Sequence, residues 1–235
     1  MKTVSCFCAA IAATLLAACA PAQVKLPTGF ADRAVVHAVD GHSPRRFNQP
    51  MFIGPYSARR LQDGDTFHWA QGTGRTALVD SARDYAFTLT TAGAPSVEVQ
   101  CQTRQSVLRH GDEDSMFELD LTAAEGPLLS CGLRLGGAGP VHELELGARG
   151  RHLEGRLDSP WGGLNVRSLH GLAGSSLSTM DANGFELSRG GAPWMVVETI
   201  NAGRVLIEPT TDPRQRAYLA AAATALLLLD ADLGD

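Results

Sequence analysis

The end of the chain decides the fold: residues 212–229 read DPRQRAYLAAAATALLLL. Asp212 followed by Pro213 is a typical helix start, because it offers a capping side chain and then a proline at the first helical position. The predicted helix, residues 213–230, is apolar on all sides rather than along one stripe. Its apolar part of about 13 residues is shorter than the ~18 that a membrane-spanning helix needs. We therefore expect this helix to be buried on every side by the rest of the protein.

Short strands fill the chain before this helix. Apolar runs are separated by turn residues, and several of them alternate apolar with polar positions, as Phe117 to Leu121 does, which is typical of antiparallel sheets. The predicted strands are 34–39, 51–53, 66–69, 85–91, 96–102, 106–109, 116–121, 128–135, 141–146, 152–157, 164–169, 185–188, 194–200 and 204–208. An all-β domain can surround a helix only by closing a sheet around it. The sequence therefore predicts a mainly β fold: an antiparallel, closed or nearly closed β-barrel of about 12 strands that encloses the hydrophobic C-terminal helix.

Residues 183–230 resemble the tubby-like superfamily, which includes tubby C-terminal domains, phospholipid scramblases and LURP-one-related proteins. The matching features are Asn183 to Leu187, the Gly190-Gly191 turn, the strand from Trp194, and Asp212 ahead of the helix. The resemblance implies a many-stranded antiparallel barrel around a hydrophobic C-terminal helix. The phosphoinositide-binding and calcium-binding residues of tubby and scramblase relatives have no counterpart here, so we do not expect their activities.

The beginning of the chain is typical of an export signal. Lys2 is its only charge before the small and apolar residues 6–18, and Leu16-Ala17-Ala18-Cys19 resembles the lipobox of bacterial lipoproteins. That resemblance implies cleavage before Cys19, acylation of Cys19, and a lasting membrane anchor of two or three acyl chains. Because Ala20 rather than Asp follows the cysteine, it also implies the periplasmic face of an outer membrane. The alternative is a core helix that ends in a chance cysteine.

Three segments follow from these expectations. Residues 1–18 are a lipoprotein signal peptide, residues 19–31 a lipidated tether with Pro21 and Pro27, and residues 32–235 a single barrel domain that ends in the helix 213–230. A domain of this length can build a full core without a metal or a disulfide.

Two of the five cysteines remain for a disulfide. Cys6 and Cys8 lie in the signal and Cys19 carries the lipid, which leaves Cys101 and Cys131 in an exported, oxidising compartment. Both alternate with polar residues in their predicted strands, so both thiols should face the same interior. The alternative is two separately buried free cysteines.

Charge argues against a nucleic-acid partner. The chain has 20 Lys and Arg against 25 Asp and Glu, a formal net charge of -5, and 44% of its residues are hydrophobic. No surplus of positive charge attracts phosphate backbones, and the composition is that of a folded chain.

The candidate ligand-binding residues lie between His42 and Leu61. This stretch concentrates paired arginines among aromatic residues and prolines, a mixture suited to gripping a small acidic ligand or a loop of an envelope protein, because arginine binds carboxylate or phosphate through two parallel hydrogen bonds. The candidates are Arg45, Arg46, Arg59, Arg60 and Tyr56. The alternative is solvated arginines beside core aromatics.

The search for catalytic chemistry gives little. The seven histidines are scattered without metal-ligand spacing, and the Gly72 to Ala77 stretch, which resembles a dinucleotide loop, is interpreted as a hairpin turn because no helix follows it. We therefore predict no metal, no cofactor and no catalytic residue. The expected function is a lipid-anchored envelope protein that acts as a non-catalytic binding or scaffold module. The alternative is a periplasm-facing hydrolase whose triad comes from distant residues.

Overall fold

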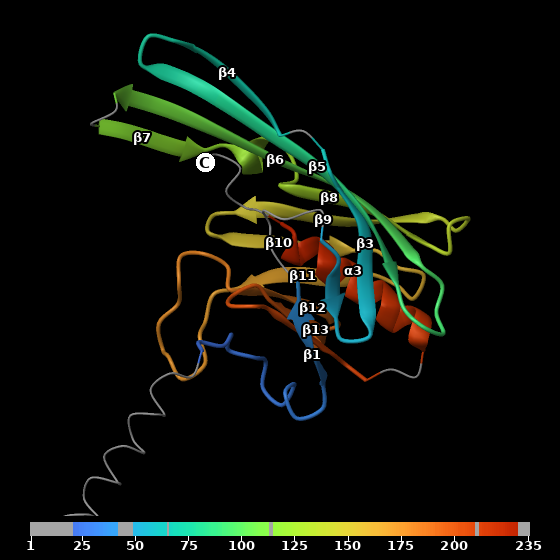
Figure 1. Ribbon diagram of the computed structural model, residues 1–235. Coiled ribbons are helices and arrows are strands. Elements are labelled where there is room, and N and C mark those ends of the chain that lie inside the picture. Colours follow the sequence, from blue (N-terminus) through green and yellow to red (C-terminus); the bar gives the residue numbers. More distant parts are fainter. Residues whose placement is uncertain (1–20, 42–48, 65, 113–114, 210–211, 230–235) are drawn as a thin grey trace, which may run out of the picture.

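The computed structural model describes residues 21–41, 49–64, 66–112, 115–209 and 212–229 (Figure 1). Within these ranges the chain is mainly β, with fourteen strands and two helices. The elements are β1 (Val35–Asp40), β2 (Met51–Ile53), β3 (Tyr56–Asp63), β4 (Phe67–Thr73), β5 (Thr76–Thr90), β6 (Val97–Asp112), β7 (Ser115–Asp120), α2 (Thr122–Glu125), β8 (Leu129–Leu135), β9 (Val141–Arg149), β10 (His152–Leu157), β11 (Leu164–Leu169), β12 (Gly184–Arg189), β13 (Ala192–Glu198), β14 (Arg204–Ile207) and α3 (Pro213–Leu227).

Twelve of these strands close into an antiparallel barrel. Their order around the barrel is β5-β3-β2-β1-β14-β13-β12-β11-β10-β9-β8-β6, and β6 pairs with β5 to complete the ring. Most neighbours in the ring are also consecutive in sequence, as expected for strands joined by short turns. The predicted closed barrel of about 12 strands is therefore confirmed.

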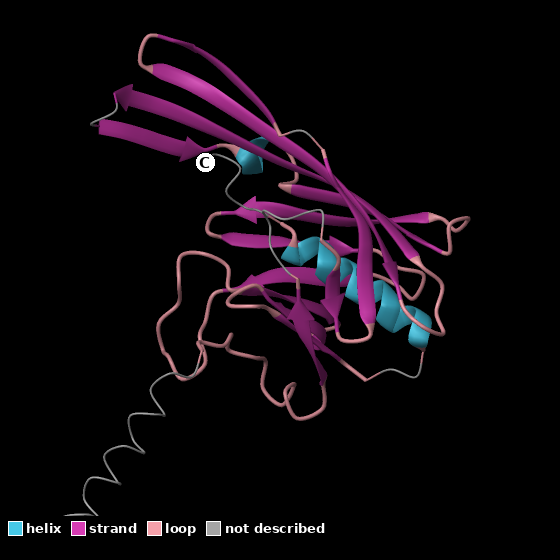
Figure 2. Ribbon diagram, viewed as in Figure 1, coloured by secondary structure: helices cyan, strands magenta, loops and turns pink. Residues whose placement is uncertain are grey.

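Helix α3 lies inside the barrel (Figure 2). It contacts β3, β5, β6, β8, β13 and β14. Every residue from Ala217 to Leu228 is at most 2% exposed, so no face of the helix reaches solvent over this length. The run Ala220 to Ala223 keeps the helix thin inside the core cluster, which also holds large strand side chains such as Phe87 and Leu89. The expected all-round burial is confirmed. Among the described residues, no helix has the length and apolarity needed to cross a membrane.

Polar groups inside the barrel are paired with the helix backbone. The Tyr85 hydroxyl donates to the Ala225 carbonyl at 2.8 Å, and the Thr224 hydroxyl donates to the Ala220 carbonyl at 2.9 Å. Burial raises the pKa of the Tyr85 hydroxyl, so it stays a donor at physiological pH. The helix ends at Leu227 rather than at residue 230, and residues 230–235 lie outside the described part of the chain.

A disulfide joins Cys101 and Cys131, as predicted. The two residues are direct partners in the pairing of β6 with β8, and their Cα atoms are 4.0 Å apart. Both side chains point into the core. The bond therefore ties two neighbouring strands of the barrel wall.

An arm of four strands projects from the barrel (Figure 1). Strands β5 and β6 are far longer than their neighbours, and their outer halves pair with β4 and β7 respectively. The sequence predicted two separate strands at 96–102 and 106–109, but these are one continuous strand, β6. The predicted hairpin turn at Gly72 to Ala77 is confirmed, with Gly74 at a φ of 66° between β4 and β5.

The described part of the expected tether, residues 21–31, packs against the barrel. Val24 and Phe30 are buried, and Phe30 forms a small core on the outside of the wall with Val196 and Leu206. The expected signal peptide, residues 1–18, and Cys19 lie outside the described residues. The chain is therefore attached to the domain from Ala22 onward, where the Ala22 carbonyl accepts a hydrogen bond from Asn201.

Candidate functional site

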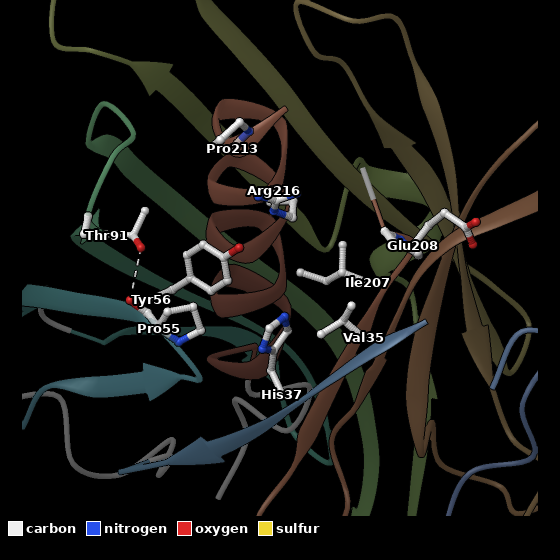
Figure 3. Close-up of a pocket in the computed structure, with 11 residues that line it drawn as sticks. Val35, His37, Pro55, Tyr56, Thr91, Ile207, Glu208, Pro213 and Arg216 are labelled. Carbon is white, nitrogen blue, oxygen red and sulfur yellow. Dashed lines mark hydrogen bonds between the residues drawn. The ribbon is translucent and has the colours of Figure 1, made fainter. Parts of the chain in front are cut away.

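A cavity of about 410 Å³ opens at the end of the barrel where α3 begins (Figure 3). Its walls come from β1, from the β2–β3 turn, from the loop after β5, from the end of β14 and from the first turn of α3. Apolar residues form most of the wall, and the remaining lining side chains are those of His37, Tyr56, Thr91, Glu208 and Arg216. This volume lies within the range of small-molecule sites, about 300 to 1,000 Å³.

The start of α3 places Arg216 in this cavity. The Asp212 carboxylate caps the helix, with one oxygen accepting the Arg214 backbone N–H at 2.9 Å and the other accepting the Trp161 indole N–H at 3.1 Å. Pro213 then begins the helix, and Arg216 follows within its first turn. The positive end of the helix dipole lies beside the same cavity.

Tyr56 and His37 face Arg216 across the cavity. The Arg216 side chain is hydrogen-bonded to the Tyr56 hydroxyl. The rings of Tyr56 and His37 lie edge to face, with their centroids 5.6 Å apart. Burial, and secondly the charge of Arg216, lower the pKa of His37, so its imidazole is neutral at pH 7. The β2–β3 turn passes close to this ring, and a side chain at Gly54 would not fit there, because its Cβ would lie 2.5 Å from His37 Nδ1.

Glu208 is the acidic residue among those that line the cavity, and it forms an ion pair with Arg33. Its carboxylate accepts from Arg33 Nε at 2.6 Å, and Figure 3 shows it turned away from Tyr56 and His37. Arg216 places its guanidinium group on the inner wall of the cavity. Such a site suits a ligand with one anionic group and an apolar body.

Of the predicted ligand-binding residues, the structure describes the side chains of Tyr56 and Arg59, and these two do not lie together. Tyr56 lines the cavity, but Arg59 lies on the opposite face of β3, where it is exposed and donates to the Ser57 hydroxyl at 3.0 Å. Two side chains an odd number of residues apart on a strand point to opposite faces, and this separates Tyr56 from Arg59. Arg45 and Arg46 lie outside the described residues, as does the side chain of Arg60.

Arg216, which accompanies Tyr56 in the cavity, was not among the predicted ligand-binding residues. Arg216 lies three residues after Pro213, immediately before the apolar run of the helix. A polar first turn on an otherwise buried helix has to lie at a mouth of the barrel, so this position was available from sequence as a candidate. His37 carried no such signal, because only the β1–β2–β3 pairing brings it beside Tyr56.

Two described serines contact histidines, which bears on the hydrolase alternative. Ser168 Oγ lies 2.8 Å from His170 Nε2, and Ser81 Oγ lies 2.9 Å from His68 Nδ1. Ser168 is buried and its oxygen also accepts the Leu153 backbone N–H at 2.9 Å, while His170 Nδ1 is buried without a partner. In neither pair do the described residues place a carboxylate on the other histidine nitrogen. Neither pair therefore forms a Ser-His-carboxylate triad within the described residues.

The arm presents a second notable surface. Side chains that face each other across the strands share one face of a sheet, and on the arm this face carries Phe67, Trp69, Phe117 and Leu119. Phe67 is 64% and Phe117 61% exposed. Leu78 and Leu108 lie between them, in one row with Leu119. The same face also carries the polar residues Asp80, Ser106 and His110. Exposed apolar side chains gathered on one face often mark interaction sites.

No match was found when the chain was compared with protein-family models, curated proteins and solved structures. Among the described residues, no group of three or more His, Cys, Asp or Glu side chains could hold a metal ion.

Proposed function

We propose that this protein is a lipid-anchored envelope protein that acts as a non-catalytic binding module, with the cavity beside Arg216 as its ligand site. The observation that carries the proposal is the convergence of Arg216, Tyr56 and His37 on a cavity with mostly apolar walls. The ligand is a small molecule with one carboxylate or similar anionic group and an apolar body of a few carbon atoms.

The anchor and the location are part of the same proposal. The lipobox Leu16 to Cys19 supports acylation at Cys19, and Ala20 supports the periplasmic face of an outer membrane. The enclosed C-terminal helix supports a relationship with the tubby-like superfamily, because the two share the same layout of barrel and helix.

A pair of matched probes tests the ligand site. Benzoate should bind and its neutral analogue benzamide should not, because only benzoate offers an anion to Arg216. Arg216→Gln should weaken benzoate binding about 10- to 100-fold, since a hydrogen bond to a charged group contributes about 1.5–3 kcal/mol. Isothermal titration calorimetry measures both effects.

Arg214→Gln is the control, because Arg214 is exposed in the same turn of α3 and does not line the cavity. It should leave benzoate binding unchanged. Equal binding of benzoate and benzamide, or equal effects of the two substitutions, would refute the site.

A scaffold role is the second candidate, and the exposed face of the arm favours it. The occupant that we propose for this face is a second copy of the chain, because an apolar sheet face packs well against another one about 10 Å away. Three half-exposed aromatic residues and Leu119 offer on the order of 500 Å² per copy. Two copies would bury about 1,000 Å², which reaches the lower limit of specific interfaces.

A further inference from the structure

The loop between β11 and β12 lies against the first described residues of the chain. Val24 forms a β-bridge with Leu172, the Lys25 N–H donates to the Gly171 carbonyl at 2.9 Å, and the Ala173 N–H donates to the Gln23 carbonyl at 2.7 Å. Figure 1 shows the two segments side by side, the first in blue and the loop in orange. The start of the domain and this loop therefore form one surface.

Buried charges fix the N-terminal segment in place. The Glu198 carboxylate, which is 3% exposed, accepts the Val24 N–H at 2.8 Å and is paired with Arg204. Arg204 also donates to the Gln23 side chain at 3.2 Å. The Asn201 side chain donates to the Ala22 carbonyl at 2.7 Å. The segment is thus held from Ala22 onward.

These contacts leave a very short connection to the proposed anchor. Cys19 precedes Ala22 by three residues, and a fully extended chain spans at most about 3.3–3.6 Å per residue. An acylated Cys19 would therefore lie within about 10 Å of Ala22, a distance comparable to the thickness of one headgroup layer. With the proposed anchor in place, the end of the barrel that holds Ala22 would face the membrane surface.

The same loop exposes two large apolar side chains a few residues after those that contact the N-terminal segment. Leu177 is 77% and Met180 75% exposed, more than any other large hydrophobic residue of the described part of the chain. Residues 171–182 carry one charge, Asp181, among small and hydroxyl-bearing residues. Lys25 packs against Gly171 and is exposed, so it adds to this surface a cation that anionic lipid headgroups would attract.

We propose that the β11–β12 loop inserts Leu177 and Met180 into the bilayer beside the acylated Cys19. The inference rests on the proposed lipid anchor and adds a second contact to it. Two side chains bury less apolar surface than one acyl chain, and one acyl chain alone gives only marginal binding. The loop therefore orients the barrel on the membrane rather than anchoring it.

Environment-sensitive labels on the purified lipidated protein test the insertion. Leu177→Cys or Met180→Cys provides a single free thiol, because Cys101 and Cys131 are bonded to each other. The thiol is labelled with a nitrobenzoxadiazole dye, and the protein is reconstituted into vesicles of phosphatidylethanolamine and phosphatidylglycerol. The emission at both positions should shift to the blue and gain intensity.

Val141→Cys is the matched control. Val141 is also apolar and 51% exposed, but it lies at the opposite end of the barrel wall, because β9, β10 and β11 alternate in direction. The emission of a label at residue 141 should be the same with and without vesicles. If labels at residues 177 and 180 on vesicle-bound protein also keep the emission of dye in water, the proposed insertion is wrong, while the lipid anchor is unaffected.

The acylation of Cys19 is tested in a separate experiment. Mass spectrometry of the N-terminal peptide should show acylated Cys19, and Cys19→Ser should release the protein from the membrane fraction. An unacylated Cys19 would overturn the anchor and the insertion together.

Discussion

At the scale of single residues, the cavity depends on how Arg216 affects its neighbours. Its guanidinium shares a hydrogen bond with Tyr56 and helps to keep His37 neutral. Burial raises the pKa of Tyr56, so its hydroxyl remains protonated and can donate to an incoming anion. Three different side chains thus present one positive charge and neutral hydrogen-bonding groups to the same space.

His37 makes the stability of the protein depend on pH. Its pKa in the folded protein lies below the ordinary value of 6.5, so the unfolded chain binds this proton more readily. The stabilisation is complete above pH 6.5 and is lost as the pH falls below it. In His37→Gln, the decrease in melting temperature between about pH 7.5 and about pH 5.5 should be smaller than in the wild type. His152→Gln, at an exposed position, should retain the wild-type decrease, and an identical decrease in His37→Gln would contradict the assignment.

At the scale of elements, α3 and the barrel wall depend on each other. The helix has no exposed face between Ala217 and Leu228. The inward-facing side chains of the described strands and those of the helix form one core cluster. Short side chains on the helix allow the wall to approach closely, and leucines fill the end where the alanines stop. The helix is therefore the central part of the hydrophobic core.

A carboxylate in this helix should prevent folding. Ala222→Asp or Leu226→Asp would bury an unpaired charge, which costs several kcal/mol and exceeds what a marginally stable domain tolerates. Expression of soluble protein and circular dichroism should show the loss. Arg214→Asp, in the exposed first turn, should fold. Tolerance of Asp at two adjacent positions among Leu226, Leu227 and Leu228 would be incompatible with the enclosed helix.

The disulfide should stabilise the barrel wall. Cys101 and Cys131 are 30 residues apart, and in the chain-entropy model closing such a loop stabilises by about 3 to 4 kcal/mol. The double variant Cys101→Ala, Cys131→Ala should lose about this much unfolding free energy in urea. Reductant should lower the stability of the wild type and not that of the double variant. A reductant effect of equal size on both proteins would show that the bond contributes nothing.

At the scale of the whole molecule, the barrel divides its surfaces between different tasks. The cavity lies at the end where α3 begins, the β11–β12 loop and the start of the domain form another surface, and the arm projects away from the wall (Figure 1). The apolar face of the arm continues the outer face of the barrel, because Leu78 and the inward-facing Tyr85 are an odd number of residues apart on β5. The barrel core cannot cover this face.

Self-association through the arm can be measured by analytical ultracentrifugation. The Cys19→Ser protein should sediment as a dimer at high concentration and dissociate on dilution, because the expected interface is small. Phe117→Lys should shift the protein to monomer by placing a charge in the buried patch. Val141→Lys, on the barrel wall, should leave the dimer intact. A wild-type protein that stays monomeric at all concentrations would exclude a second copy as the occupant.

Local chemistry alone determined the enclosed helix, the antiparallel strands and the disulfide. A helix that is apolar on all sides has to be surrounded, and alternating strands without helices between them can surround it only by closing. Cys101 and Cys131 were the only cysteines left once the N-terminal three were assigned to the signal and the lipid. The helix and the strands needed only residue types, their period and their spacing, whereas the disulfide also drew on the resemblance of Leu16 to Cys19 to a lipobox.

The cavity, the arm and the contacts of the N-terminal segment could not be predicted from the sequence, because they depend on which strands pair in the folded protein. Tyr56 and Arg59 are neighbours in sequence but lie on opposite faces of β3, whereas Tyr56 and Arg216 meet because the helix enters the barrel beside β3. Strand β6 is continuous from Val97 to Asp112 because β5 pairs with it along nearly its whole length, which no local pattern reveals. A sequence determines the period of each element and the polarity of each face. Which faces meet is decided by the order of the strands around the ring, through hydrogen bonds between residues far apart in the chain.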